Sequence, residues 1–226
     1  MNGQEKDSAA LRREYDQFYR TTDFAHYPDE VSKGAVRCIL HVCRSKERAR
    51  VLDVGCGTGY YSDILHQAGC HVTGIDISDH AIATARERFP SITFVSGDAL
   101  SYETAERFDC IFSLGMSVMN TRQLQNVRDY IHRMLGLLAP GGVLVFLGDS
   151  DLSGGMSRSG SWIYHRWDEI LEMPPPGTPS VDGPYLTHFR LMARLPRLAV
   201  SAPVTFLLRY LPLRFPRKFL YLFRID

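Results

Sequence analysis

Short apolar runs alternate with amphipathic segments between about residues 50 and 148. The runs have the length of buried strands, and the segments between them repeat their apolar residues with the period of a helix. We therefore expect strands at Val51–Val54, Cys70–Ile75, Ile92–Ser96, Phe108–Leu114 and Val143–Leu147. We expect helices at Gly59–Ala68, Asp79–Phe89 (capped by Ser78 or Asp79) and Leu124–Leu138. This alternation indicates a parallel sheet covered by helices on both faces.

The pattern changes on either side of this core. Residues 8–20 and 30–44 are amphipathic and predict two N-terminal helices. After Gly148 a Gly/Ser-rich stretch and a Pro/Gly-rich stretch flank the short aromatic segment Trp162–Met173, which has helical character. Such interrupted, turn-rich sequence predicts a cap that is inserted into the fold.

Two late apolar runs, residues 199–208 and 219–224, predict a final antiparallel pair of strands that closes the edge of the sheet. The expected fold is α/β: a doubly wound, mostly parallel seven-stranded sheet with an antiparallel edge strand, N-terminal helices and a cap insertion before the last two strands. The expected parts are an N-terminal helical segment, a core of alternating strands and helices, an inserted cap and C-terminal strands, at residues 1–46, 47–149, 150–198 and 199–226.

Charge is distributed unevenly, although the formal net charge of the chain is only +1. Residues 51–183 sum to −8, whereas residues 184–226 sum to +7 and contain Asp226 as their one acid. The basic, aromatic C-terminal segment suits either an edge hairpin with arginines facing water or peripheral contact with a membrane surface. Because its basic groups form no dense run, nucleic acid is disfavoured as a partner.

The remaining bulk features concern location and metals. No apolar run reaches the roughly 18–20 residues of a membrane span, and the polar start shows no secretory signal. We therefore expect a cytoplasmic protein. The five cysteines contain no CxxC pair, which predicts buried thiols and no metal site.

The strongest chemical signal is the glycine-rich turn after the first predicted strand, in the sequence VLDVGCGTG of residues 51–59. Glycines allow the backbone to approach a ligand closely. The spacing is GxGxG, where dinucleotide-binding proteins have GxGxxG, and the turn lacks the lysine of a phosphate-binding loop. Asp53 lies two residues before the first glycine. An acidic turn without lysine favours a ligand that has a cationic amino-acid end and no phosphates.

Two further acids follow the next two strands. Asp76 ends the second strand, about twenty residues after the turn, where an acid can hydrogen-bond ribose hydroxyls. Asp98 ends the third strand, where it could accept a hydrogen bond from an adenine amino group. Each acid could instead cap a helix. Their order and spacing indicate a nucleoside site at one edge of the sheet.

Together the segments VLDVGCGTGY, GIDIS, GDAL, FDCIFSLG and LAPGGVLVF resemble the class I, Rossmann-like S-adenosylmethionine-dependent methyltransferase family over about residues 48–148. The resemblance implies S-adenosylmethionine as cofactor and S-adenosylhomocysteine as product. It also implies a cofactor site formed by Asp53, Gly55, Cys56, Gly57, Asp76, Ile77, Asp98, Ala99, Leu114 and Gly115. The segment YDQFY resembles the N-terminal motif that folds over the cofactor in many small-molecule members, so Tyr15 and Tyr19 join this set, although packing aromatics are an equal alternative.

The expected function is transfer of a methyl group to an O, N or C nucleophile of a small-molecule or lipid-like acceptor. A general base would help with a weakly acidic acceptor. His165 in the predicted cap is the first candidate, with His26, His188 and Asp149 as others; a packing role for His165 is the alternative. Two other functions stay open: a non-catalytic S-adenosylmethionine-binding module and an NAD-dependent oxidoreductase.

Overall fold

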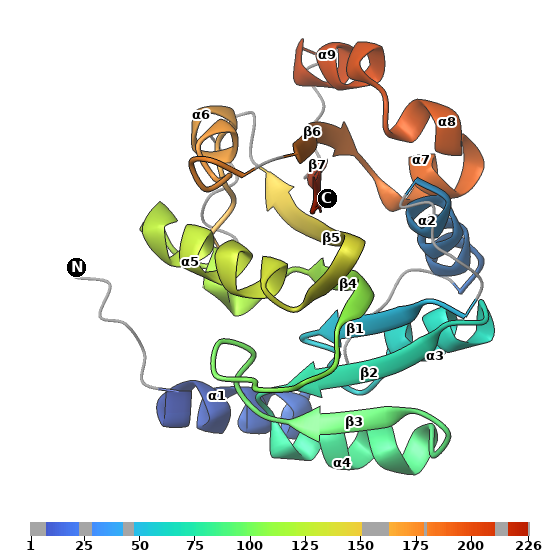
Figure 1. Cartoon of the computed structure of the whole chain (residues 1–226), viewed down its shortest axis with the longest axis vertical. Coiled ribbons are helices and arrows are strands. Elements are labelled where there is room, and N and C mark those ends of the chain that lie inside the picture. Colours follow the sequence, from blue (N-terminus) through green and yellow to red (C-terminus); the bar gives the residue numbers. More distant parts are fainter. Residues whose placement is uncertain are drawn as a thin grey trace.

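One seven-stranded sheet organises the molecule, in the order β3-β2-β1-β4-β5-β7-β6 (Figure 1). The computed structural model describes residues 8–22, 29–42, 48–150, 163–178, 180–210 and 217–225. The strands are β1 (Arg50–Val54), β2 (His71–Asp76), β3 (Thr93–Ser96), β4 (Phe108–Leu114), β5 (Leu138–Ser150), β6 (Ser180–Thr187) and β7 (Arg217–Arg224). Pairing is parallel from β3 to β5, and β7 runs antiparallel between β5 and the edge strand β6. The predicted doubly wound, mostly parallel sheet is confirmed.

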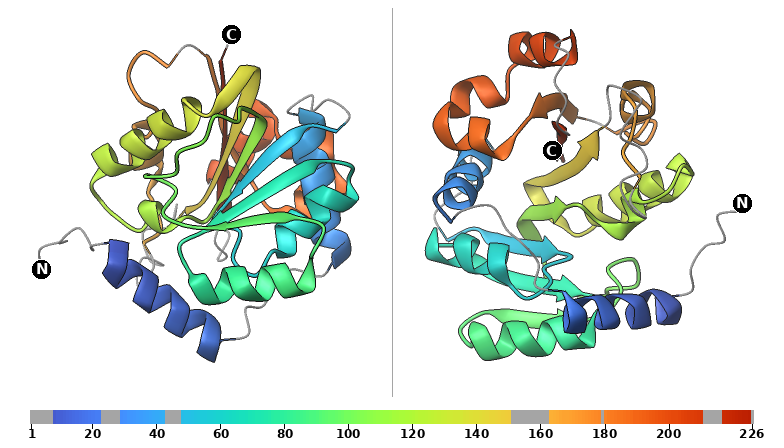
Figure 2. Two further views of the ribbon diagram at one scale, coloured as in Figure 1. Left: turned by 60° about the horizontal axis from the view of Figure 1, so that its bottom comes forward. Right: turned by 180° about the vertical axis from the view of Figure 1, so that it is seen from behind.

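Helices cover both faces of the sheet (Figure 2). They are α1 (Ser8–Thr21), α2 (Asp29–Val42), α3 (Tyr60–Gln67), α4 (Asp79–Arg88), the 3-10 turn η1 (Ser117–Met119), α5 (Leu124–Leu135), α6 (Trp167–Leu171), α7 (Phe189–Arg194), α8 (Pro196–Ala199) and α9 (Ala202–Tyr210). One core lies between the sheet and α2, α3, α4, α7 and α8, and the other lies between the sheet and α5 and α6. The two N-terminal helices are therefore confirmed.

The alternation of side chains along β5 builds both cores. Val143, Val145 and Leu147 belong to the core beside α2 and α3, whereas Leu144 and Phe146 belong to the core beside α5. All five side chains are buried, because a parallel sheet with helices on both faces leaves neither side of its central strands to water.

Helix α4 begins where the sequence predicts. Its N-cap is Ser78, whose Oγ accepts a hydrogen bond from the backbone N of Ala81 at 3.1 Å. This bond satisfies one of the amide groups that the first turn of a helix leaves unpaired. The cap fixes the position of the residues between β2 and α4, which belong to the candidate site.

The predicted strand over residues 199–208 is wrong, because residues 202–210 form helix α9. A short apolar run does not by itself distinguish a strand from a helix, and Pro203 in the first turn of α9 is compatible with a helix. The missing strand is β6, inside the predicted cap. Its sequence Asp182-Gly183-Pro184 argues against a strand, but an edge position and the irregular pairing found there accommodate proline.

The basic C-terminal segment lies partly inside the sheet. Residues 219–223 of β7 are buried, which confirms the other late strand, and Lys218 Nζ lies 2.9 Å from Asp149 Oδ1 on β5. Arg214 and the side chain of Arg217 lie outside the described residues. In the part of the chain that the structure describes, no helix is long and apolar enough to span a membrane.

Candidate cofactor site

The glycine-rich turn folds back onto β2. The backbone N–H groups of Gly55 and Cys56 both donate to the carbonyl of Ile75, at 2.8 and 3.1 Å. Gly57 has a φ of +52°, which disfavours any residue with a Cβ, and a Cβ at this position would lie 2.6 Å from the hydroxyl of Tyr19. The turn thus requires glycine both for its conformation and for the close approach of Tyr19.

Asp76 joins the turn to the start of α4. One carboxylate oxygen accepts from the backbone N of Gly57 and the other from the backbone N of Ser78, both at 2.9 Å. The side chain is only 7% exposed. Burial raises the pKa of Asp76 above its ordinary value, although the hydrogen bonds from Ser78 and Gly57 act in the opposite direction. Asp76 is therefore held rigidly at the carboxyl end of β2, where the sequence predicts a ribose contact.

Asp53 lies in the same buried region and is 3% exposed. Its carboxylate accepts a hydrogen bond of 2.6 Å from Ser62 Oγ on α3. Burial, with a smaller contribution from the negative charge of Asp76, raises the pKa of Asp53 to about 7. In the described part of the chain neither carboxylate is paired with a lysine, arginine or histidine. Two buried acids without a basic partner favour a ligand that carries positive charge.

The residues predicted for the adenine end follow β2 and β3. Asp98 accepts from the backbone N of Leu100 at 2.9 Å and also from the hydroxyl of Ser8 on α1. Ala99 is buried, and Ile77 is half-buried. The loops that carry Asp76 and Asp98 are adjacent because β2 and β3 pair in parallel, with Asp76 opposite Ser96.

Helix α1 lies across the ends toward which β2 and β3 point (Figure 1). Its Asp16 Oδ1 accepts from Ser78 Oγ at 2.6 Å and from the backbone N of His80 at 3.1 Å. The helix presents Tyr15 and Tyr19 to the site. Burial, together with the charge of Asp76, raises the pKa of Tyr15 to about 12 and raises the pKa of Tyr19 further. Both phenols therefore remain protonated at neutral pH.

The carboxyl end of β4 completes the set. Gly115 follows Leu114, has a φ of +61° and donates its N–H to the carbonyl of Leu147 at 3.0 Å. A Cβ at Gly115 would meet no atom within 4 Å, whereas a Cβ at Gly55 would meet Met116 Sδ. Open space therefore lies beside Gly115. Cys56 is buried, and burial raises the pKa of its thiol.

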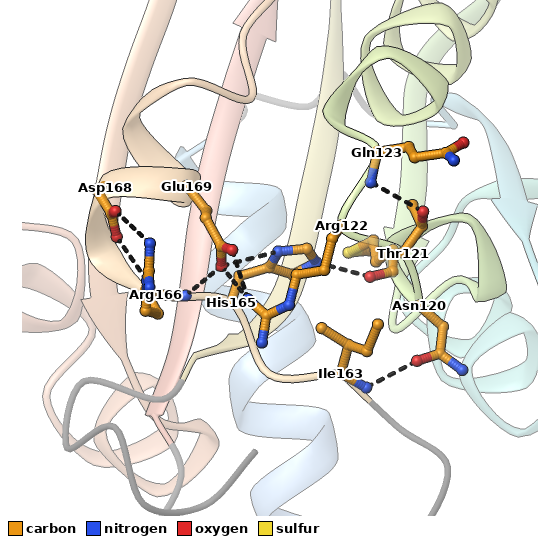
Figure 3. Close-up of polar contacts among 10 residues, drawn as sticks. Asn120, Thr121, Arg122, Gln123, Ile163, His165, Arg166, Asp168 and Glu169 are labelled. Atoms are coloured by element: carbon orange, nitrogen blue, oxygen red, sulfur yellow. Dashed lines mark hydrogen bonds and ion pairs between the residues drawn. The ribbon is translucent and has the colours of Figure 1, made fainter. Parts of the chain in front are cut away.

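His165 lies in the segment after residue 163 and belongs to the polar network drawn in Figure 3. It is 1% exposed, and its Nε2 donates to the carbonyl of Met119 at 2.6 Å. Its Nδ1 lies 3.7 Å from Glu169, which also pairs with Arg122. Burial lowers the pKa of His165, so the imidazole is neutral at neutral pH. The contacts give His165 a bridging position between η1 and the segment after residue 163.

The other candidate bases also have protein partners or are not described. His188 Nδ1 accepts from the backbone N of Arg190 at 3.2 Å, which caps α7. Asp149 pairs with Lys218, as described above. His26 lies outside the described residues.

The sequence reasoning missed several residues that shape the site. They are Ser8, Arg12, Asp16, Ser62 and Met116. Only Asp16 lies in a motif that resembles the family, the segment YDQFY, where it follows Tyr15. Its role depends on contacts with residues 62 and 64 positions away, which no local pattern reveals.

Comparison with known proteins places this arrangement in a family. Residues 51–142 match the family model described as a methyltransferase domain. Residues 51–142 thus form a methyltransferase domain, and the chain is homologous to class I, S-adenosylmethionine-dependent methyltransferases. This result confirms the predicted family and its cofactor, S-adenosylmethionine. The site fits that cofactor, because its buried acids have no basic partner among the described residues and open space lies beside Gly115.

Several curated methyltransferases are similar to part of this chain. It is 32% identical over 124 residues to a malonyl-[acyl-carrier protein] O-methyltransferase of Enterobacter lignolyticus, covering 54% of this chain and 48% of the relative. It is also 32% identical to the trans-aconitate 2-methyltransferase of Escherichia coli O1:K1, covering 54% of this chain and 47% of the relative. A dTDP-amino-sugar N,N-dimethyltransferase of Streptomyces venezuelae is 27% identical, with coverage of 58% and 54%. The chain spans about half the length of these curated relatives.

Solved structures show the same fold over nearly the whole chain. The N-methyltransferase NodS from Bradyrhizobium japonicum, in complex with S-adenosyl-L-homocysteine, matches with a TM-score of 0.64 at 19% identity and covers 95% of this chain and 98% of its own. The [4+2]-cyclase SpnF matches with a TM-score of 0.68 at 18% identity, covering 97% and 96%. These likenesses confirm the fold. The fold alone does not determine the reaction, which depends on the residues of the site.

Proposed function

We propose that this chain transfers a methyl group from S-adenosylmethionine to an O, N or C nucleophile of a small-molecule acceptor. The observation that carries the proposal is the buried acidic pair Asp53 and Asp76, which lies beside the glycine turn and has no basic partner among the described residues. A cationic methionine end would compensate this charge. An NAD-dependent oxidoreductase would instead have to bring pyrophosphate to the same acidic turn, which is electrostatically unfavourable.

Different residues of the site would contact different parts of the cofactor. Asp53, Gly55 and Gly57 would line the methionine end, and Asp76 would accept hydrogen bonds from the ribose. The adenine would lie against Ile77, with Asp98 and Ala99 at its edge. Tyr15, Tyr19 and Cys56 would surround the ligand from α1 and from the turn, while Leu114 and Gly115 would lie under the sulfur.

The bound cofactor supplies an electrophilic methyl group on a sulfonium. The protein must hold the acceptor atom in line with that methyl group and exclude water, and orientation of this kind can contribute several kcal/mol. Gly115, whose Cβ position is open, lies between the end of β4 and η1 in the chain. We propose that the acceptor enters there, with the predicted cap after residue 150 providing its specificity.

The relatives suggest acceptors to test. The three described above are named for an acyl-carrier-protein malonyl group, for trans-aconitate and for a dTDP-amino sugar. We therefore propose small acids, acyl thioesters and amino sugars as a first panel, followed by lipid-like and natural-product intermediates.

Isothermal titration with S-adenosylmethionine and S-adenosylhomocysteine tests the cofactor site. Wild type should bind both ligands, and Asp76→Ala should weaken binding roughly 10- to 100-fold, because hydrogen bonds to a charged group contribute about 1.5–3 kcal/mol. The matched control Glu103→Ala removes an exposed acid outside the site and should bind like wild type. No binding of either ligand to folded wild type would contradict the proposal, and a melting temperature raised by NAD would favour the oxidoreductase.

Transfer of isotopically labelled methyl groups to the acceptor panel then tests catalysis. Turnover of any member would separate the enzyme from a non-catalytic cofactor-binding module. Cofactor binding without transfer to any acceptor would favour the binding module.

A further inference from the structure

A cationic and apolar face lies on the outside of α7 and α8. We call it the α7–α8 face and define it by Arg37 of α2 together with Arg190, Arg194, Leu195, Arg197 and Leu198. All six side chains are exposed, and Leu195 and Leu198 retain 51% and 49% of their accessible surface. Half-exposed leucines at the corner between two short helices contribute nothing to either core.

The arginines of this face lack acidic partners. Among the described residues none of the four pairs with a carboxylate, whereas Arg12, Arg122 and Arg166 elsewhere on the surface each do. The sequence explains the difference, because no Asp or Glu occurs between residues 183 and 225. The face is therefore a local concentration of uncompensated positive charge.

A hollow of about 670 Å³ adjoins the face, between α2 and α7–α8. Arg37, His41 and Arg197 line it together with the apolar side chains of Met192 and Val200. Helices α2 and α7 pack tightly beside it, where a Cβ on Gly34 would lie 2.6 Å from the Cβ of Ala193. The hollow thus combines basic groups with an apolar wall, which suits an anion that carries an apolar chain.

The position of the face separates it from the cofactor site. Figures 1 and 2 show α7 and α8 at the opposite end of the molecule from α1. A surface bound to α7 and α8 would leave α1 and the strand ends beneath it uncovered. Its partner can therefore be tested without any effect on cofactor binding.

We propose that the α7–α8 face binds the surface of an anionic lipid bilayer, with its arginines on the lipid phosphates and Leu195 and Leu198 in the headgroup region. Charge complementarity requires an anionic partner. The exposed leucines and the apolar wall of the hollow favour lipid over nucleic acid, whose backbone offers no apolar counterpart. The proposal differs from contact through the C-terminal segment, because residues 219–223 are buried in the sheet.

Flotation with phosphatidylglycerol/phosphatidylcholine vesicles tests the proposal on the full chain. Wild type should float with the anionic vesicles at low salt and not with pure phosphatidylcholine. The double variant Arg194→Gln/Arg197→Gln should bind about 30-fold more weakly, because each basic residue near an anionic surface contributes roughly a factor of five. The variant Leu195→Ser/Leu198→Ser should lose the part of the binding that survives high salt.

The matched control Arg88→Gln/Arg107→Gln removes the same charge from exposed positions on another part of the surface and should float like wild type. Titration with S-adenosylhomocysteine checks that each variant is folded, and it should give the wild-type affinity. Absence of flotation of folded wild type, or an equal loss in the control, would overturn the proposal. So would competition by DNA that is stronger than competition by anionic vesicles.

Discussion

The charges of the cofactor site can be understood from Asp53 and Asp76. Each carboxylate is buried, and burial raises the pKa of both. The charge of Asp76 further raises the pKa of Asp53, and the charge of Asp16 further raises the pKa of Asp76. Ser62 and the backbone of the turn donate hydrogen bonds but bring no positive charge. A cationic ligand would lower both pKa values, so binding and deprotonation should be linked.

Cofactor affinity should therefore depend on pH through Asp53. With a pKa of about 7, the carboxyl is mostly protonated at pH 6 and mostly ionised at pH 8, so affinity for S-adenosylmethionine should rise up to about tenfold over this interval. Isothermal titration at several pH values measures the slope, and Asp53→Asn should flatten it. Equal slopes in wild type and Asp53→Asn would contradict this assignment.

The same pKa has a consequence for stability. Because the pKa of Asp53 is raised from 3.8 to about 7 on folding, the folded chain holds a proton that the unfolded chain has released. Stability of the ligand-free protein should thus fall as the pH rises from about 4 to about 7. At pH 8 Asp53→Asn should melt a few degrees above wild type.

Polar contacts help to hold helix α1, none of whose residues is fully buried. Asp16 places a negative charge at the first turn of α4, where the helix dipole favours it. Arg12 adds an ion pair with Asp79 at 2.7 Å. The orientation of Tyr15 and Tyr19 over the glycine turn therefore depends on these hydrogen bonds and on this ion pair.

Weakening these bonds should weaken cofactor binding without unfolding the core. Asp16→Ala should reduce affinity for S-adenosylhomocysteine roughly tenfold, the effect of losing hydrogen bonds to a charged group. Hydrogen exchange of α1 should rise in the same variant. The control Arg13→Ala changes an exposed position of the same helix, and a similar loss there would show that helix formation, not anchoring, is what matters.

The sequence predicted correctly those elements that are determined by residues close to them in the chain. The turn after β1 and the acids after β2 and β3 follow from glycine spacing and strand ends, and Ser78 caps α4 as its residue type suggests. The anchoring of α1 depends on partners as far as 90 positions away. Strand β6 escaped prediction because its Gly-Pro sequence is tolerated only at a sheet edge, and the edge is defined by tertiary pairing.

At the scale of the whole molecule, the carboxyl edge of the sheet has two halves. The first three strands and α1 form the predicted cofactor half, and β5 and the segment after residue 163 form the half that we assign to the acceptor. The end of β4 lies where the two halves meet. The network of Figure 3 joins the parts of the second half: Asn120 accepts from the backbone N of Ile163 at 2.7 Å, and His165 Nε2 donates to the carbonyl of Met119. Since none of these contacts involves the acidic pair, the two halves can be perturbed separately.

His165 is the residue that decides how this second half works. If it is a bridge, His165→Asn should lower the melting temperature by several degrees, the effect of losing a buried hydrogen bond of about 1–3 kcal/mol, and affinity for S-adenosylhomocysteine should stay within about twofold of wild type. Glu169→Gln keeps the hydrogen bond from Nε2 to Met119 and removes the negative charge beside Arg122, so this control should retain most of the methyl transfer. A general base would behave differently, because His165→Asn would then reduce the turnover of the folded protein roughly 100- to 10,000-fold. The burial of the ring and the bond from Nε2 to the Met119 carbonyl favour the loss of stability.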